Sequence, residues 1–97
     1  MISKGVSYNK ISEIFKALSN PTRLCIVHGL MEKGSCNVSY MEKCLETSQS
    51  AISQHLSKLK AAGIVKSKRF GNEIHYQIAN EKIKRLIEFV FNELISE

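Results

Sequence analysis

Three cysteines and one histidine in the first half of this 97-residue chain have the most reactive side chains. Cys25 and His28 are three residues apart, so a helix would carry both on one side. Cys36 and Cys44 follow them. Thiolates combined with an imidazole suit Zn(II), Cd(II), Cu(I) or As(III), whereas Cys36 and Cys44 alone could form a redox-sensitive pair. The alternative for each is a structural role, and Cys25, inside an apolar segment, is predicted to belong to the core.

No further catalytic constellation accompanies these side chains. The sequence has no glycine-rich phosphate loop, no acid pair and no complete metal motif, so we predict that the protein is not an enzyme. An odd number of cysteines without an apolar leader at residues 1–5 favours reduced thiols and a cytoplasmic location. No apolar run approaches the length of a membrane span, so we expect no membrane partner.

A second group of side chains is suited to hydrogen bonding with nucleic acid. Ile52, Leu56 and Leu59 form one apolar stripe of a helix between residues 47 and 60. Hydroxyls and amides cover the opposite face, and no acidic residue occurs from Thr47 to Phe70. Such side chains near a helix start can contact base edges and phosphates in a major groove. The segment therefore predicts a DNA recognition helix, with an ordinary surface helix as the alternative.

The positive charge is concentrated around this helix. The chain carries a net charge of +5, and residues 48–80 hold five basic side chains against Glu73 alone. Residues 81–97 hold three basic and four acidic side chains. A phosphate-binding face requires this kind of clustering.

Capping residues and apolar periodicity predict three helices ahead of the recognition helix. Ser7 begins the first, over about 8–18, whose apolar stripe is Ile11, Ile14, Phe15 and Leu18. Asn20 and Pro21 begin a second, largely buried helix, which ends at Gly34. The capping-box spacing of Ser39 and Glu42 predicts a short third helix that ends near Leu45.

A β-hairpin and a last helix are predicted after Gly63, which ends the recognition helix. Residues 64–69 and 74–78 read as two strands joined by a turn at 70–73. A basic hairpin in this position is typical of a wing. The last helix, from Glu81 to about Ile95, has more apolar surface than one small domain can cover. Dimerisation would cover it, and would also present two recognition helices to a palindromic site.

Three runs of this sequence resemble the ArsR/SmtB family of winged-helix bacterial repressors, which respond to metals or redox signals. They are residues 17–24, 48–56 and 59–65, in the order and spacing of the family. The resemblance implies one domain over residues 1–97, mainly α with a small β-hairpin, in the winged helix-turn-helix order α-α-α-α-β-β-α. It also implies a homodimer formed by the terminal helices, about 8–18 and 80–95. Such a dimer would bind an inverted-repeat operator in double-stranded DNA, and an inducer would lower its DNA affinity.

The sensing sites known in the family do not carry over to this sequence. The two positions of its thiolate site on the third helix are Asn37 and Ser39 here, and Cys36 is one residue out of register. The positions of its zinc site on the last helix are Asn80, Ile83, Leu94 and Glu97, of which three are poor ligands or none. Its dithiol persulfide sensors use a cysteine in the last helix, where this chain has none. The inducer therefore stays open between a thiophilic metal, a thiol-reactive agent and none, and no metal is expected to be required for folding.

The predicted function is that of a sequence-specific DNA-binding transcriptional repressor. Its predicted DNA contacts divide into three groups. The candidates for base edges or for the helix cap are Ser48, Gln49, Ser50, Ser53 and Gln54, those for phosphates are His55 and Lys58, and those for the wing are Lys66, Lys68, Arg69 and Asn72. A winged helix that binds protein is one alternative, although the face offers only Phe70 as an aromatic anchor. Non-specific nucleic-acid binding is another.

Overall fold

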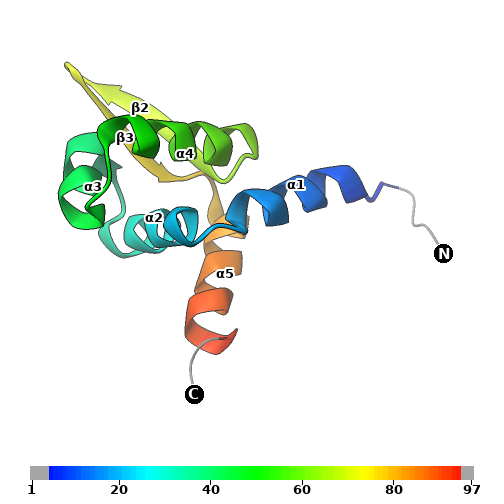
Figure 1. The fold of residues 1–97 in the computed structure, drawn as a ribbon. Helices are drawn as coiled ribbons and strands as arrows, with labels where there is room; N and C mark the ends of the chain where they lie inside the picture. The colour runs from blue at the N-terminus through cyan, green and yellow to red at the C-terminus, as the bar shows by residue number, and fades with distance from the viewer. Residues whose placement is uncertain (1–4, 95–97) are drawn as a thin grey trace.

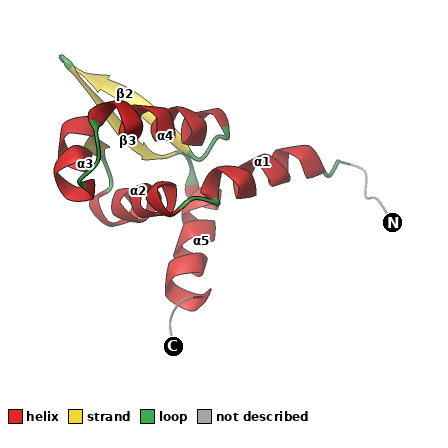
Figure 2. Ribbon diagram, in the orientation of Figure 1, coloured by secondary structure: helices red, strands yellow, loops and turns green. Residues whose placement is uncertain are grey.

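The structure, a computed structural model, describes residues 5–94 as six helices and a three-stranded sheet (Figure 1). In chain order the elements are α1 (Tyr8–Leu18), α2 (Pro21–Lys33), β1 (Cys36–Asn37), α3 (Val38–Leu45), α4 (Gln49–Ala61), β2 (Val65–Phe70), β3 (Glu73–Ile78), α5 (Glu81–Phe89) and the π-helix η1 (Val90–Leu94). Helices α2, α3 and α4 pack together, whereas α1, α5 and the β2–β3 hairpin project from them in three directions (Figure 2).

Polar side chains fix where the helices begin. Ser7, Asn20, Ser48 and Asn80 each accept a hydrogen bond from the backbone N–H three residues on, which confirms the predicted helix caps. The predicted short helix α3 and its end at Leu45 are confirmed, but its predicted cap, Ser39, was wrong. Its N-cap is Asn37, whose Oδ1 accepts from the backbone N–H of Tyr40 at 2.8 Å, because the preceding extended chain belongs to a strand.

That strand, β1, was not predicted. It pairs antiparallel with β3, with Cys36 opposite Tyr76 and Asn37 opposite His75, so the sheet order is β1-β3-β2. Two residues are too few to show alternation in a sequence. The predicted hairpin is confirmed: β2 and β3 pair from Val65–Ile78 to Phe70–Glu73. Its turn begins at Gly71, whose φ of 61° suits glycine.

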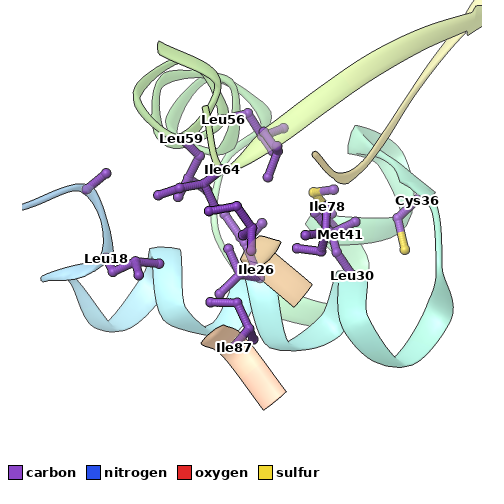
Figure 3. Packing of buried hydrophobic residues seen from close by; sticks show 14 of the residues in the cluster. Leu18, Ile26, Leu30, Cys36, Met41, Leu56, Leu59, Ile64, Ile78 and Ile87 are labelled. Carbon is purple, nitrogen blue, oxygen red and sulfur yellow. The ribbon is translucent and has the colours of Figure 1, made fainter. Parts of the chain in front are cut away.

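One hydrophobic core joins every element that carries the predicted functional residues. Ile26 and Leu30 of α2 face Leu56 and Leu59 of α4 across this core (Figure 3). Ile64, Ile78 and Ile87 extend it to the start of the hairpin and to α5. Helix α4 is thereby fixed with its predicted apolar stripe inward.

Helix α2 is less buried than its composition suggests. Ile26, Val27 and Leu30 are in the core, but Cys25 and His28 are exposed to solvent. The assignment of Cys25 to the core was therefore wrong. Residues 25 and 28 lie about one helical turn apart, outside the buried face of α2 that Ile26, Val27 and Leu30 form.

The two terminal helices keep apolar side chains at the surface. On α1, Leu18 is buried and Ile14 is partly buried, but Tyr8, Ile11 and Phe15 are 55%, 45% and 60% exposed. At the other end of the chain Phe89 and Leu94 are 58% and 67% exposed.

We predicted a single α-helix from Glu81 to about residue 95, but the structure divides this segment into two helices. Its α-helical part ends at Phe89 and the π-helix η1 follows. Ile95 and Glu97 lie outside the described residues. None of the helices described here is long and apolar enough to cross a membrane.

Candidate nucleic-acid interface and thiol residues

The exposed face of α4 carries the candidate base contacts. Ser48 caps the helix, its Oγ accepting from the backbone N–H of Ala51 at 3.1 Å. Ile52, Leu56 and Leu59 are 0%, 1% and 0% exposed, which anchors the inward face. The side chains on the outward face are all exposed: Gln49, Ser50, Ser53, Gln54 and Lys58. Their predicted placement is confirmed, while their role as DNA contacts stays a prediction.

Helix α3 and a tight turn position the start of α4. Glu46, the residue after α3, adopts a left-handed conformation with φ 51°, which reverses the chain within a few residues. Thr47 and Ser48 complete the connection. Two helices joined by so short a turn form a helix-turn-helix, in which the second helix presents its N-terminal residues outward.

His55 has a partner inside the chain, which the sequence did not reveal. Its Nδ1 lies 3.2 Å from Nη1 of Arg23, whose Nε donates to the carbonyl of Ala17 at 2.6 Å. Arg23 therefore ties the end of α1 to the middle of α4. His55 is half-buried in this contact, and its role as a phosphate contact stays a prediction. Burial and the positive charge of Arg23 lower the pKa of His55 below its ordinary 6.5.

This lowered pKa gives a testable pH dependence. The folded protein binds a proton at His55 less readily than the unfolded chain does, so this residue destabilises the fold as pH falls below 6.5. We expect the free energy of unfolding in urea to decrease between about pH 7.5 and about pH 5.5. The decrease should be smaller in His55→Gln, which cannot titrate. An equal decrease in both proteins would show that His55 does not contribute.

The hairpin presents the predicted wing residues at the surface. Lys66, Lys68, Arg69 and Asn72 are all exposed, and the hairpin projects beyond α3 and α4 (Figure 2). The Nε of Arg69 donates to the carbonyl of Gly71 at 3.2 Å, which holds the guanidinium at the turn. Positive groups at the tip of a projecting hairpin are suited to contact phosphates or a minor groove.

His75 connects the wing to the chain that precedes β1, and sequence reasoning missed it. Its Nε2 lies 3.0 Å from Oε1 of Glu73, and its Nδ1 lies 3.4 Å from Oγ of Ser35. Its ring also meets the edge of Phe70, with 5.2 Å between the ring centres. The hairpin itself gathers Phe70, Glu73 and His75, whereas the pairing of β1 with β3 adds Ser35.

The four candidate sensing residues separate into two places. Cys25, Cys36 and Cys44 line one hollow between α2, β1 and α3. His28 lies outside this hollow: its ring stacks on Phe91 at 4.2 Å, and its Nε2 is 3.4 Å from Oε1 of Glu32. The predicted grouping of His28 with the thiols was therefore wrong. Within residues 5–94 no three histidine, cysteine or glutamate side chains are arranged to hold a metal ion.

The three thiols are free and differ in environment. Cys25 and Cys44 are exposed, whereas Cys36 is buried. Burial raises the pKa of Cys36; the nearby Lys33 ammonium opposes this and the Cys44 thiolate adds to it. The buried Cys36 thiol is therefore a poorer nucleophile near neutral pH than an ordinary cysteine.

Comparison with known proteins identifies relatives over most of the chain. A family model described as "bacterial regulatory protein, arsR family" matches residues 20–67. An uncharacterised HTH-type transcriptional regulator of Methanocaldococcus jannaschii, MJ1325, is 43% identical over 86% of this chain and 93% of its own length. A CadC homologue of Staphylococcus aureus, named as a cadmium resistance transcriptional regulatory protein, is 35% identical over 84% of this chain and 67% of its own.

A solved structure matches the fold at similar coverage. The homodimeric winged helix-turn-helix DNA-binding domain Mb0332 of Mycobacterium bovis superposes with a TM-score of 0.81. It is 28% identical, and the match covers 92% of this chain and 87% of the other. The predicted winged helix-turn-helix architecture is thereby confirmed.

Proposed function

Because the chain belongs to the ArsR family of bacterial transcriptional regulators, and is not an enzyme, we propose that it represses transcription by binding an inverted-repeat operator as a homodimer. The observation that carries this proposal is the exposed face of α4. Its amides and hydroxyls are held outward by a fully buried opposite face, and the chain has no carboxylate from Thr47 to Phe70. A major groove accepts a helix of this kind.

The proposed contacts divide into two kinds. Amides can bond two positions of a base edge at once, so Gln49 and Gln54 are assigned to sequence readout, with Ser50 and Ser53 beside them. Lysine ammonium groups neutralise phosphates without regard to sequence. Lys58, Lys66, Lys68 and Arg69 are therefore assigned to the backbone, and Asn72 to the tip of the wing. His55 joins the phosphate contacts through Nε2, since Arg23 occupies Nδ1.

Two single substitutions test this division. We expect Gln54→Ala to reduce affinity for the operator by roughly 5- to 100-fold, the value of one good base contact. Affinity for a random duplex should hardly change. We expect Lys68→Ala to weaken binding to both duplexes equally. It should also reduce the salt dependence of binding by the amount expected for the loss of about one phosphate contact. Fluorescence anisotropy on the DNA upstream of the gene and on a shuffled duplex measures both effects.

Both substitutions change exposed side chains, so loss of folding does not confuse the result. Equal losses on both duplexes in both variants would refute the assignment of Gln54 to base readout. Wild-type protein that does not distinguish the two duplexes would favour non-specific nucleic-acid binding.

The terminal helices supply the proposed dimer interface. Ile11 and Phe15 on α1 and Phe89 near the end of α5 leave apolar surface exposed in the single chain. A two-fold dimer would cover this surface and space two α4 helices for an inverted repeat. The solved relative Mb0332, described as homodimeric, supports the same arrangement.

Release from DNA is assigned to chemistry at the thiols, with Cys36 and Cys44 as the principal residues. A relative named for cadmium resistance supports a thiophilic signal. We expect reduced, metal-free protein to bind the operator and to be released by Zn(II), Cd(II), As(III) or a thiol-reactive compound. That release should be lost in Cys36→Ser or Cys44→Ser. Binding that none of these agents disturbs would instead favour a regulator without a small-molecule inducer.

A further inference from the structure

The hollow that contains the three thiols has the size and lining of an organic ligand site. Its volume is about 470 Å³, within the range of pockets that hold small molecules and far larger than an ion requires. Leu30, Met41 and Leu45 supply apolar walls, and Cys25, Cys36 and Cys44 supply thiols. An apolar hollow with three soft nucleophiles suits an apolar compound that is also electrophilic.

A cation lines the same hollow as the thiols. Lys33 lines the hollow, and its Nζ lies 5.0 Å from the centre of the Tyr40 ring. Tyr40 is the main cause that raises the pKa of Lys33, and Cys36 and Cys44 add to it less. A positive group on the wall of the hollow can stabilise negative charge that develops on the carbonyl oxygen of a bound compound.

We propose that this hollow binds a small apolar α,β-unsaturated carbonyl compound, which alkylates Cys44. Cys44 is the nucleophile because its thiol is exposed and lies one turn along α3 from Tyr40, over whose ring the Lys33 ammonium sits. Cys36 is buried, and Cys25 lies on α2 instead. The Cys44 sulfur bonds to the β carbon and the carbon–carbon π bond breaks. Its electron pair moves toward the carbonyl oxygen beside Lys33, and the proton lost by the thiol ends on the α carbon. No oxidant or reductant is needed.

Strand β1 connects this hollow to both proposed DNA-binding elements. Cys36 lines the hollow and pairs with Tyr76 of the wing strand, while the adjacent Asn37 caps α3. A ligand wedged between α2 and α3 would displace α3 and β1, and with them α4 and the wing. Alkylation is therefore expected to release DNA. This regulatory consequence rests on the proposed repressor function, whereas the reaction itself does not.

The reaction is tested without DNA by intact-protein mass spectrometry and peptide mapping. Cinnamaldehyde is the apolar probe, and acrylamide is a small polar compound that reacts at the same kind of double bond. The cinnamaldehyde-to-acrylamide rate ratio should exceed that of free glutathione by about tenfold or more, because the hollow holds the apolar reactant against the thiol. The adduct should map to Cys44.

Gly29 offers a matched pair of variants, since it lines the hollow and a Cβ added there meets no atom within 4 Å. Gly29→Leu fills the hollow and should return the ratio to the glutathione value, whereas Gly29→Ala should retain most of the effect. A wild-type ratio equal to that of glutathione, or equal labelling of Cys25 and Cys44, would overturn the proposal.

The proposed release of DNA is tested by measuring how tightly the singly alkylated protein binds the operator, again by fluorescence anisotropy. Its affinity should fall by about tenfold or more, a typical coupling between sites, and Cys44→Ser treated in the same way should be unaffected. Selective alkylation with unchanged affinity would overturn the regulatory role. Failure of unmodified protein to bind the operator would count against the proposed repressor function, and the labelling ratio would still decide the ligand site.

Discussion

Replacing Phe15 by glutamate is expected to convert the protein to a monomer and to lower operator affinity by roughly 100-fold or more, the scale on which bivalent binding exceeds single-site binding. Phe15 is 60% exposed on α1 and forms one apolar surface with Tyr8 and Ile11. A carboxylate buried against an apolar partner surface without a counter-charge is strongly unfavourable. Analytical ultracentrifugation measures the loss of the dimer, and anisotropy on the operator measures the loss of affinity.

Asn9→Glu is the control for the Phe15 substitution. It makes the same change of charge on the same helix, at an exposed position away from the apolar surface. This variant should remain a dimer and keep its DNA affinity. Phe15→Glu protein that is still dimeric and still binds the operator would show that α1 lies outside the interface.

Replacing Ile52 by alanine is expected to reduce the free energy of unfolding by about 2–4 kcal/mol, as for other large-to-small changes in a packed core. Ile52 is 0% exposed and lies at the inward face of α4. A domain of this size is stable by only about 5–15 kcal/mol, so the loss is a large fraction of the total. Urea unfolding followed by circular dichroism measures it.

Ser53→Ala, the next residue along α4, is the control for Ile52→Ala. Its side chain is exposed, so stability should change by less than about 0.5 kcal/mol. A loss below about 1 kcal/mol for Ile52→Ala would contradict the role of Ile52 as the main anchor of the recognition helix.

The sequence by itself determined the elements that present the DNA-binding face. Ser48 and Gly63 mark the ends of α4, and the spacing of Ile52, Leu56 and Leu59 sets which side faces inward. Such signals are local, because a cap bonds a backbone N–H three residues away and helical period alone selects a face. The wing was equally predictable, since its turn and its paired strands are adjacent in the chain.

Only the tertiary structure decided how the thiols are arranged. Strand β1 exists because its two residues pair with His75 and Tyr76, about 40 residues later. Because of that pairing, Asn37 caps α3 instead of the predicted Ser39, and Cys36 lines the hollow. Cys25 is exposed because Ile26, Val27 and Leu30 form the buried face of α2, which helical spacing alone could not show in so apolar a segment. Contacts between residues far apart in the chain leave no periodic signal in the sequence, so the candidate sensing site, unlike the recognition helix, required the folded structure.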